Sequence, residues 1–270
     1  MKTVKFLETL ADQFFHAFYR KEWQGGVEPA LRDLSVAEAY EVQDLVAQKR
    51  INAGESVAGF KVGCTSMAIR SQFGLAEPIS GRLFRPHIFE KNVSLDWSAF
   101  VNCAIEPELV LRIGEDLRGE DLSDADLIDA IEYANPGIEI HNFRFWQFPP
   151  TIQELICSGG IHAGLIVRSA RVSPADLQFR DEMFSVCKDE NLITSAPASE
   201  IMGGPLRSLR WLVSFLTAKG CSLKKDSLVI PGSPVELVEI RQGTELRVAI
   251  ERVGSLVASF KRKKSNKPLG

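Results

Sequence analysis

The sequence has few of the residues that build sulfur and imidazole metal cages. It contains 5 cysteines and 4 histidines among 270 residues, and no two cysteines form a CxxC pair. Zinc-ligand spacings are absent as well. The cysteines are odd in number and far apart, so we expect reduced, mostly buried thiols in a cytoplasmic protein. These absences exclude a metal cage rich in cysteine or histidine.

The sequence also lacks long apolar runs and an excess of basic residues. No apolar run approaches the ~18 residues that a membrane-spanning helix needs. Acidic residues interrupt the N-terminal stretch MKTVKFLETLADQFFHAF, which argues against a secretory signal. The 32 basic and 35 acidic residues give a net charge of −3, whereas nucleic-acid-binding proteins usually carry a basic excess. We therefore expect neither a nucleic-acid nor a membrane partner, and a solvated tail at KRKKSNKPLG.

The remaining composition is typical of a globular protein with a large core. Apolar residues make up 45% and charged residues 25% of the chain. A chain of this length hides roughly 73% of its unfolded surface on folding. Two helices are predicted near the N-terminus. The first covers residues 4–19, and the second begins after Ser35, which forms a capping box with Glu38, and ends at Gly54.

A β-rich body follows these helices. Extended patterns are predicted at 56–62, 101–113, 137–143, 159–167 and in the C-terminal third, helical patterns at 67–73, 123–134 and 205–219, and a turn at 77–81. No internal repeat or long linker divides the chain. We therefore predict an α+β protein with a single domain over residues 1–270, composed of an N-terminal helical section at 1–55 and a β-rich body at 56–270.

Two glutamates interrupt the predicted strand at 101–113. Alternate residues of a strand share a face, so Glu106 and Glu108 point the same way, together with Val110. Neighbouring carboxylates repel one another unless a cation or water lies between them. Two interpretations stay open: a cation site, or a half-buried strand with a solvated acidic face.

Glu139 is the third candidate, in the predicted strand GIEIHNF. If this strand lies beside the first, three carboxylates converge, and three oxygen ligands with open positions suit Mg²⁺ or Mn²⁺. An exposed Glu139 is the alternative. His141 shares the face of Glu139, where it is either a residue next to the site or a hydrogen-bonded core histidine.

Lys61 lies between Phe60 and Val62 in the predicted strand at 56–62, and its side chain takes the face opposite to theirs. A lysine next to a metal and its carboxylates can act as a general acid or base, because burial near a cation lowers its pKa. The alternative is a surface lysine whose ammonium group reaches solvent. No GxGxxG or P-loop motif supports a nucleotide cofactor.

Taken in order, segments over nearly the whole chain resemble one family. The sequence is similar to the 2-oxopent-4-enoate hydratase and 4-oxalocrotonate decarboxylase family, which belongs to the fumarylacetoacetate hydrolase superfamily. The similar segments are AYEVQDLVAQKRINAGESVAGFKVGCTS, FGLAEPISGRLF, IEPELVLRIGEDL, GIEIHNFRFW, MGGPLRSLRWLVSFL and LVIPGSPVELVEI. Each short motif is unspecific by itself, and the ordered series is specific.

The resemblance implies a fold, a site and a reaction. The fold would be a mixed β-sandwich or rolled sheet, of the type of the superfamily's C-terminal domain, with helices packed outside. Glu106, Glu108 and Glu139 match the family's carboxylates for a divalent metal, Mg²⁺ or Mn²⁺, and Lys61 matches its active-site lysine. The implied enzyme adds water to a small 2-hydroxydienoic or 2-oxo-enoic acid from aromatic catabolism through a metal-stabilised enolate. We also expect a homo-oligomer.

Three departures from the family pattern leave the reaction open. Ile79 stands where the family commonly has Asp, Glu154 lies in a segment that hydratases usually read ADNASS, and Arg207 replaces a usual Asn. The same metal site also suits a 2-oxo acid decarboxylase or a C–C bond hydrolase. A non-catalytic subunit that retains the fold is a further alternative.

Overall fold

The fold is described from a computed structural model, which places residues 2–22, 28–90, 93–143, 150–169 and 171–262. The predicted solvated tail lies almost wholly outside these residues, as does the end of the segment GIEIHNFRFW. Within the placed ranges, no helix is both long and apolar enough to cross a bilayer. All five cysteines are free thiols, as predicted, but only Cys103 and Cys157 are buried. Cys64 and Cys187 are partly exposed and Cys221 is exposed, so the prediction that most of the thiols are buried is wrong.

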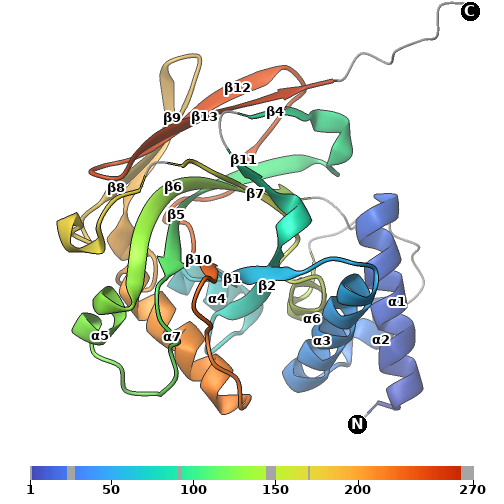
Figure 1. Cartoon of the computed structure of the whole chain (residues 1–270). Coiled ribbons are helices and arrows are strands. Elements are labelled where there is room, and N and C mark those ends of the chain that lie inside the picture. The colour runs from blue at the N-terminus through green and yellow to red at the C-terminus, as the bar shows by residue number, and fades with distance from the viewer. Residues whose placement is uncertain (1, 23–27, 91–92, 144–149, 170, 263–270) are drawn as a thin grey trace, which may run out of the picture.

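Three helices form the N-terminal section: α1 (Val4–Arg20), α2 (Glu28–Arg32) and α3 (Val36–Asn52). They stand on one side of the sheets, next to α6 (Ile152–Cys157) (Figure 1). The apolar face of α1 buries Leu7, Leu10 and Phe14 against α3 and α6. Burying an amphipathic face in this way supplies most of the stability of a helix in a protein. Both predicted N-terminal helices are therefore present.

The start of α3 has the predicted capping box. Ser35 Oγ accepts the Glu38 backbone N–H at 3.2 Å, and Glu38 Oε2 accepts the Ser35 N–H at 2.9 Å. A hydrogen bond from the Lys2 N–H, followed by those from Ser35, lowers the pKa of Glu38 to about 2. The carboxylate therefore holds together the helix start and the N-terminal segment.

We expect Ser35→Ala to lower the free energy of unfolding by about 1 kcal/mol in urea denaturation at neutral pH. Glu41→Gln, on the exposed side of the same helix, serves as the control and should leave it unchanged. The stabilisation from Glu38 is present above its ordinary pKa of 4.5 and is lost as the pH falls toward 2. Wild type and Glu38→Gln should therefore converge in acid; a difference that persists there contradicts the prediction.

Two sheets form the β-rich body. The first has the order β2-β1-β10-β5-β6-β7-β3, with β11 paired to β5, and the second has the order β4-β13-β12-β8-β9. The strands of the first sheet are β1 (Val57–Gly63), β2 (Ile79–Phe84), β3 (Ile88–Glu90), β5 (Cys103–Ile113), β6 (Ile131–Asn142), β7 (His162–Val167), β10 (Leu228–Ile230) and β11 (Val238–Glu239). Those of the second are β4 (Val93–Asp96), β8 (Met183–Lys188), β9 (Asn191–Pro197), β12 (Thr244–Ile250) and β13 (Gly254–Lys261).

The first sheet curls, so that it has an inner and an outer face (Figure 1). Its inner face carries Val110, Leu165 and Ile230, which pack together from β5, β7 and β10. Its outer face packs in two places. One part meets the second sheet in a sandwich, and the other is covered by α5 (Asp124–Asp129) and α7 (Pro205–Ala218). The predicted α+β architecture with a rolled, mixed sheet is thus confirmed.

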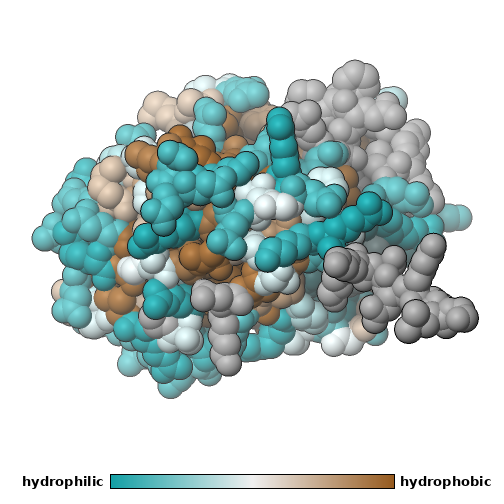
Figure 2. Space-filling model, turned by 90° about the horizontal axis from the view of Figure 1, so that it is seen from above, coloured by the Kyte–Doolittle hydropathy of each residue, from teal (hydrophilic) through white to brown (hydrophobic). Residues whose placement is uncertain are grey.

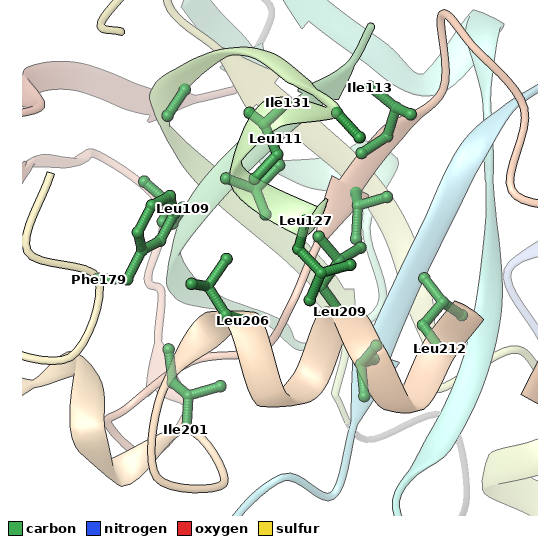
Figure 3. Packing of buried hydrophobic residues seen from close by; sticks show 14 of the residues in the cluster. Leu109, Leu111, Ile113, Leu127, Ile131, Phe179, Ile201, Leu206, Leu209 and Leu212 are labelled. Carbon is green, nitrogen blue, oxygen red and sulfur yellow. The ribbon is translucent and has the colours of Figure 1, made fainter. Parts of the chain in front are cut away.

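Alternation along β5 explains how one strand serves both faces. Leu109 and Leu111 point outward to Leu206 and Leu209 of α7 (Figure 3), while Val110 between them points inward. In the second sheet, β8 and β12 alternate in the same way. Its solvent side, in the view from above, shows hydrophilic side chains mixed with hydrophobic ones (Figure 2).

The structure corrects three sequence predictions. The turn predicted at 77–81 is largely strand β2, in which Gly81 is required because a Cβ there would lie 2.4 Å from the Gly159 carbonyl oxygen. The helix predicted at 123–134 ends at Asp129, since Ile131 onward pairs with β5. Pro136 lies inside β6 and does not begin it. It is tolerated there because β7 pairs with β6 only from Gly137.

Candidate metal centre

The antiparallel register of β5 and β6 brings the three predicted carboxylates onto one face. Glu106 lies opposite Glu139, and Glu108 lies opposite Gly137. This is the inner face of the curled sheet, with Val110 as the next residue on it. Glu108 and Glu139 are fully buried, whereas the Glu106 side chain is 22% exposed. The cluster therefore opens to solvent on the side of Glu106.

A gap in the sheet lies beside this cluster. Strand β10 pairs with β5 at Leu111 and Arg112, and β11 pairs with it at Ala104 and Ile105. Pro107 falls between the two, where its missing N–H costs no ladder hydrogen bond. The segment between β10 and β11 fills the gap.

Gly232 in that segment donates its N–H to Glu108 Oε2 at 3.2 Å. The backbone of Gly232 has a φ of +117°, and a Cβ there would lie 2.6 Å from the Thr65 Cγ2. Only glycine fits this position without strain. One oxygen of Glu108 is thereby fixed by the backbone.

Lys61 reaches the cluster from β1, which lies between β2 and β10. Its Nζ is 3.2 Å from Glu139 Oε1 and donates to the Gly160 carbonyl oxygen at 3.3 Å. Gly160 has a φ of +77°, and a Cβ there would lie 2.7 Å from Nζ, so a glycine closes over the ammonium group. The side chain is buried, and the surface-lysine interpretation is wrong.

Lys61 and Glu139 each stabilise the charged form of the other. Burial by itself would lower the pKa of Lys61, but Glu139, Glu106 and Glu108 outweigh it, and the pKa is raised. Burial raises the pKa of Glu139, whereas Lys61 and the neighbouring histidines lower it to about 2 overall. Glu139 and Lys61 therefore form a buried ion pair.

The pKa of Glu108 is shifted in the direction opposite to that of Glu139. Burial, followed by the negative charges of Glu139 and Glu106, raises the pKa of Glu108 well above its ordinary value. Three carboxylates facing one lysine leave an excess of negative charge that a proton on Glu108 relieves. A bound cation would relieve the same repulsion.

Two histidines complete the cluster, and the sequence pointed to one of them. His141 Nε2 lies 3.0 Å from Glu106 Oε2 and 3.5 Å from Glu139 Oε2. His162 Nδ1 lies 2.7 Å from Glu139 Oε1, and burial lowers the pKa of His162 to about 4. His162 begins a buried apolar strand, which is the only sequence signal for it.

A β-bulge brings His162 to this face. The register of β6 and β7 runs from Ile140 opposite Gly164 to His141 opposite His162, so that Ala163 is skipped. Ala163 consequently packs with the outer cluster, and His162 turns inward to Glu139. Bulges re-aim side chains in this manner and are frequent next to active sites.

The donor atoms fit a hard divalent cation. Among the placed residues, Glu108 Oε1 and Glu139 Oε2 are buried without a hydrogen-bond partner, while the other oxygen of each is held. Ligand atoms of Glu106, Glu139 and His141 all lie within 4.8 Å of one another. Carboxylate oxygens with exchangeable positions between them are the donors that Mg²⁺ and Mn²⁺ take in proteins.

The three departures from the family pattern lie at different distances from this cluster. Ile79 of β2 is paired with Gly63 of β1, and a Cβ added to Gly63 would lie 3.4 Å from both the Ile79 Cγ1 and Lys61 Nζ. Glu154 caps α6 by accepting the Thr151 N–H. Arg207 lines a separate cavity at the start of α7, none of whose lining residues belongs to the cluster. Only Ile79 therefore adjoins the site.

Comparison with known proteins identifies relatives over most of the chain. No protein-family model matches it. It is 29% identical over 238 residues to 2-keto-4-pentenoate hydratase 2 of Dechloromonas aromatica, covering 85% of this chain and 89% of that one. It is 27% identical over 223 residues to a 4-oxalocrotonate decarboxylase of a Pseudomonas species, covering 83% and 86%.

The solved structures agree on the fold. The 4-oxalocrotonate decarboxylase of Pseudomonas putida G7, complexed with magnesium and adipate, superposes with a TM-score of 0.91 and 23% identity over 96% of this chain and 99% of that one. Fumarylpyruvate hydrolase of Pseudomonas aeruginosa, in complex with Mn²⁺ and pyruvate, gives a TM-score of 0.60 and 16% identity over 76% and 89%. The chain is therefore a homologue of the 2-keto-4-pentenoate hydratases and 4-oxalocrotonate decarboxylases with the fold of the fumarylacetoacetate hydrolase superfamily, which confirms the predicted resemblance and the prediction of an enzyme.

Proposed function

We propose that this protein is a metal-dependent hydratase of the 2-keto-4-pentenoate hydratase type. Its substrate is a small 2-hydroxydienoic or 2-oxo-enoic acid, to which it adds water. Glu106, Glu108 and Glu139 hold the divalent metal, Mg²⁺ or Mn²⁺, and Lys61 transfers protons. When bound, the metal supplies a Lewis acid that stabilises negative charge on the oxygens of the substrate.

One observation carries this proposal. Glu108 and Glu139 each have one oxygen held by the protein and one buried oxygen without a partner among the placed residues. Burying such groups is costly unless something binds them. The two unpartnered oxygens belong to the cluster that contains Lys61, whose Nζ lies 3.2 Å from Glu139 Oε1.

The residues of the chain then have separate roles. Glu139 Oε1, held by Lys61 and His162, fixes the direction of its other oxygen. Lys61 holds a proton at Nζ next to the cluster, and positive charge placed on the carboxylates weakens their hold on that proton. The Lys61 ammonium can therefore act as a general acid and, once deprotonated, as a base.

Two small cavities, of about 40 and 30 Å³, adjoin the cluster at His162. Arg50 and Ser158 line both of them, which places a guanidinium group and a hydroxyl group next to the proposed site.

A decarboxylase with the same site is the second candidate. The observation that favours it is the superposition with the decarboxylase of Pseudomonas putida G7 over nearly the full length of both chains. Both reactions need negative charge stabilised at the same substrate oxygens, so the site is compatible with either.

The test follows the ultraviolet absorbance of 2-hydroxypenta-2,4-dienoate with protein stripped by EDTA and reloaded with Mg²⁺ or Mn²⁺. We expect consumption of the dienoate only with metal present, and loss of that activity in Glu139→Gln. Glu245→Gln, exposed on β12, is the matched control and should retain activity.

Product analysis separates the candidates. A 4-hydroxy-2-oxo acid identifies the hydratase, and CO₂ released from 4-oxalocrotonate identifies the decarboxylase. If neither substrate is consumed in the presence of any divalent metal, the hydratase proposal fails and a non-catalytic subunit is favoured.

A further inference from the structure

His141 occupies a position between two of the proposed metal carboxylates. Its Nε2 lies 3.0 Å from Glu106 Oε2 and 3.5 Å from Glu139 Oε2, and the residue is only 2% exposed. It is carried by β6, which is bordered by β5 and β7 and is therefore firmly held. An imidazole nitrogen thus faces the same point in space as two carboxylate oxygens.

These separations are close to those of atoms that share a cation. Donors bound at about 2.1 Å lie roughly 3.0 Å apart at neighbouring positions of an octahedron. His141 Nε2 lies at that distance from Glu106 Oε2, 3.0 Å, and farther from Glu139 Oε2, at 3.5 Å. A hydrogen bond from Nε2 to Glu106 gives a similar distance, and the experiment below separates the two arrangements.

The rest of the cluster keeps the relevant oxygen of Glu139 directed to His141. Its Oε1 is held by Lys61 at 3.2 Å and by His162 at 2.7 Å. Its Oε2 has no hydrogen-bond partner among the placed residues and lies on the side of His141. Lys61 and His162 thus orient the Glu139 carboxylate so that its second oxygen lies on the side of the His141 imidazole.

We propose that His141 is a nitrogen ligand of the divalent metal, and that the centre therefore prefers a first-row transition metal, such as Mn²⁺, Fe²⁺ or Co²⁺, to Mg²⁺. The inference rests on the proposed carboxylate centre and adds a fourth donor to it. Mg²⁺ takes oxygen ligands almost exclusively, whereas imidazole suits the transition metals. A set of ligands that contains an imidazole nitrogen as well as oxygens therefore makes the metal centre less selective for Mg²⁺ than an all-oxygen set.

The direct test is pulsed electron paramagnetic resonance of Mn²⁺ bound to the wild-type protein. We expect nuclear modulation from a directly coordinated ¹⁴N, which His141→Gln abolishes and His162→Gln retains. The second variant is the matched control, because His162 also contacts Glu139 but lies on its other oxygen. The wild-type spectrum by itself decides the matter if a variant fails to fold.

Calorimetric titration with single metals gives an independent readout. In His141→Gln we expect the affinity for Co²⁺ to fall by about 10–100-fold, and that for Mg²⁺ to change by less than about threefold. If Mn²⁺ binds without ¹⁴N modulation and Mg²⁺ and Co²⁺ lose affinity equally, His141 is no ligand, and the carboxylate centre stands. If no divalent metal binds the wild type, the proposed function itself is overturned.

Discussion

Replacing Lys61 with methionine should lower kcat of the metal-loaded enzyme by about 10²–10⁴-fold, the range for removal of a general acid or base. Methionine has nearly the same length and fills the space under Gly160, so the change removes the proton carrier with little effect on packing. The measurement is steady-state turnover of the dienoate at saturating metal. Lys61→Met turnover within about threefold of wild type would show that another group moves the proton.

The same variant should also lose stability when metal is absent. Lys61 and Glu139 are both buried, and removing one partner of a buried ion pair costs about 3–5 kcal/mol. Urea denaturation in EDTA measures this loss. Lys49→Met, which breaks the exposed pair of Lys49 with Asp12, is the control and should change the unfolding free energy by less than about 1 kcal/mol.

Divalent metal should stabilise Lys61→Met more than it stabilises wild type. In the variant a cation replaces the missing positive charge beside Glu139, and binding to the folded state alone stabilises it by mass action. If EDTA-treated Lys61→Met is as stable as wild type, Lys61 does not compensate the carboxylates, and the electrostatic account of the site is wrong.

The parts of the site that depend on one strand were predictable from the sequence. Strand geometry fixes that Glu106 and Glu108 share a face, and their place in an apolar strand marks them as unusual. Glu139 required that two strands be neighbours, which is frequent for strands consecutive along the chain. The three sequence-predicted carboxylates lie on one face for this reason. Ligand atoms of Glu106 and Glu139 come within 4.8 Å of each other, together with His141, and the role of the three carboxylates as metal ligands stays a prediction.

The parts that depend on irregularity were not predictable. His162 reaches Glu139 only because β7 skips Ala163, and no residue pattern encodes the position of that bulge. Lys61 is buried because a glycine at 160 closes over it, a contact 99 residues away along the chain. The helix predicted through Ala134 failed because pairing with β5 overrides local helix propensity. The single domain over 1–270 and the homo-oligomer likewise stay predictions.

Glu108→Gln should weaken divalent-metal binding by at least about 100-fold, since even the loss of residues that merely support a ligand costs 10–100-fold. The substitution keeps the shape of the side chain and its hydrogen bond from Gly232, and removes the charge. Titration calorimetry of Mn²⁺ measures the loss, with the exposed Glu245→Gln as the control. Unchanged affinity would remove Glu108 from the metal centre.

The pH dependence of binding distinguishes Glu108 from its neighbours. Its pKa is raised, so below that pKa the metal must displace a proton from Glu108, and the affinity should rise by up to about tenfold per pH unit. Glu139, with a pKa of about 2, is already ionised and contributes no such slope near neutral pH. At a pH below the raised pKa of Glu108, calorimetry in buffers of different ionisation enthalpy should therefore count more protons released per metal in wild type than in Glu108→Gln. Equal proton release in the two proteins would show that a group other than Glu108 gives up the proton when the metal binds.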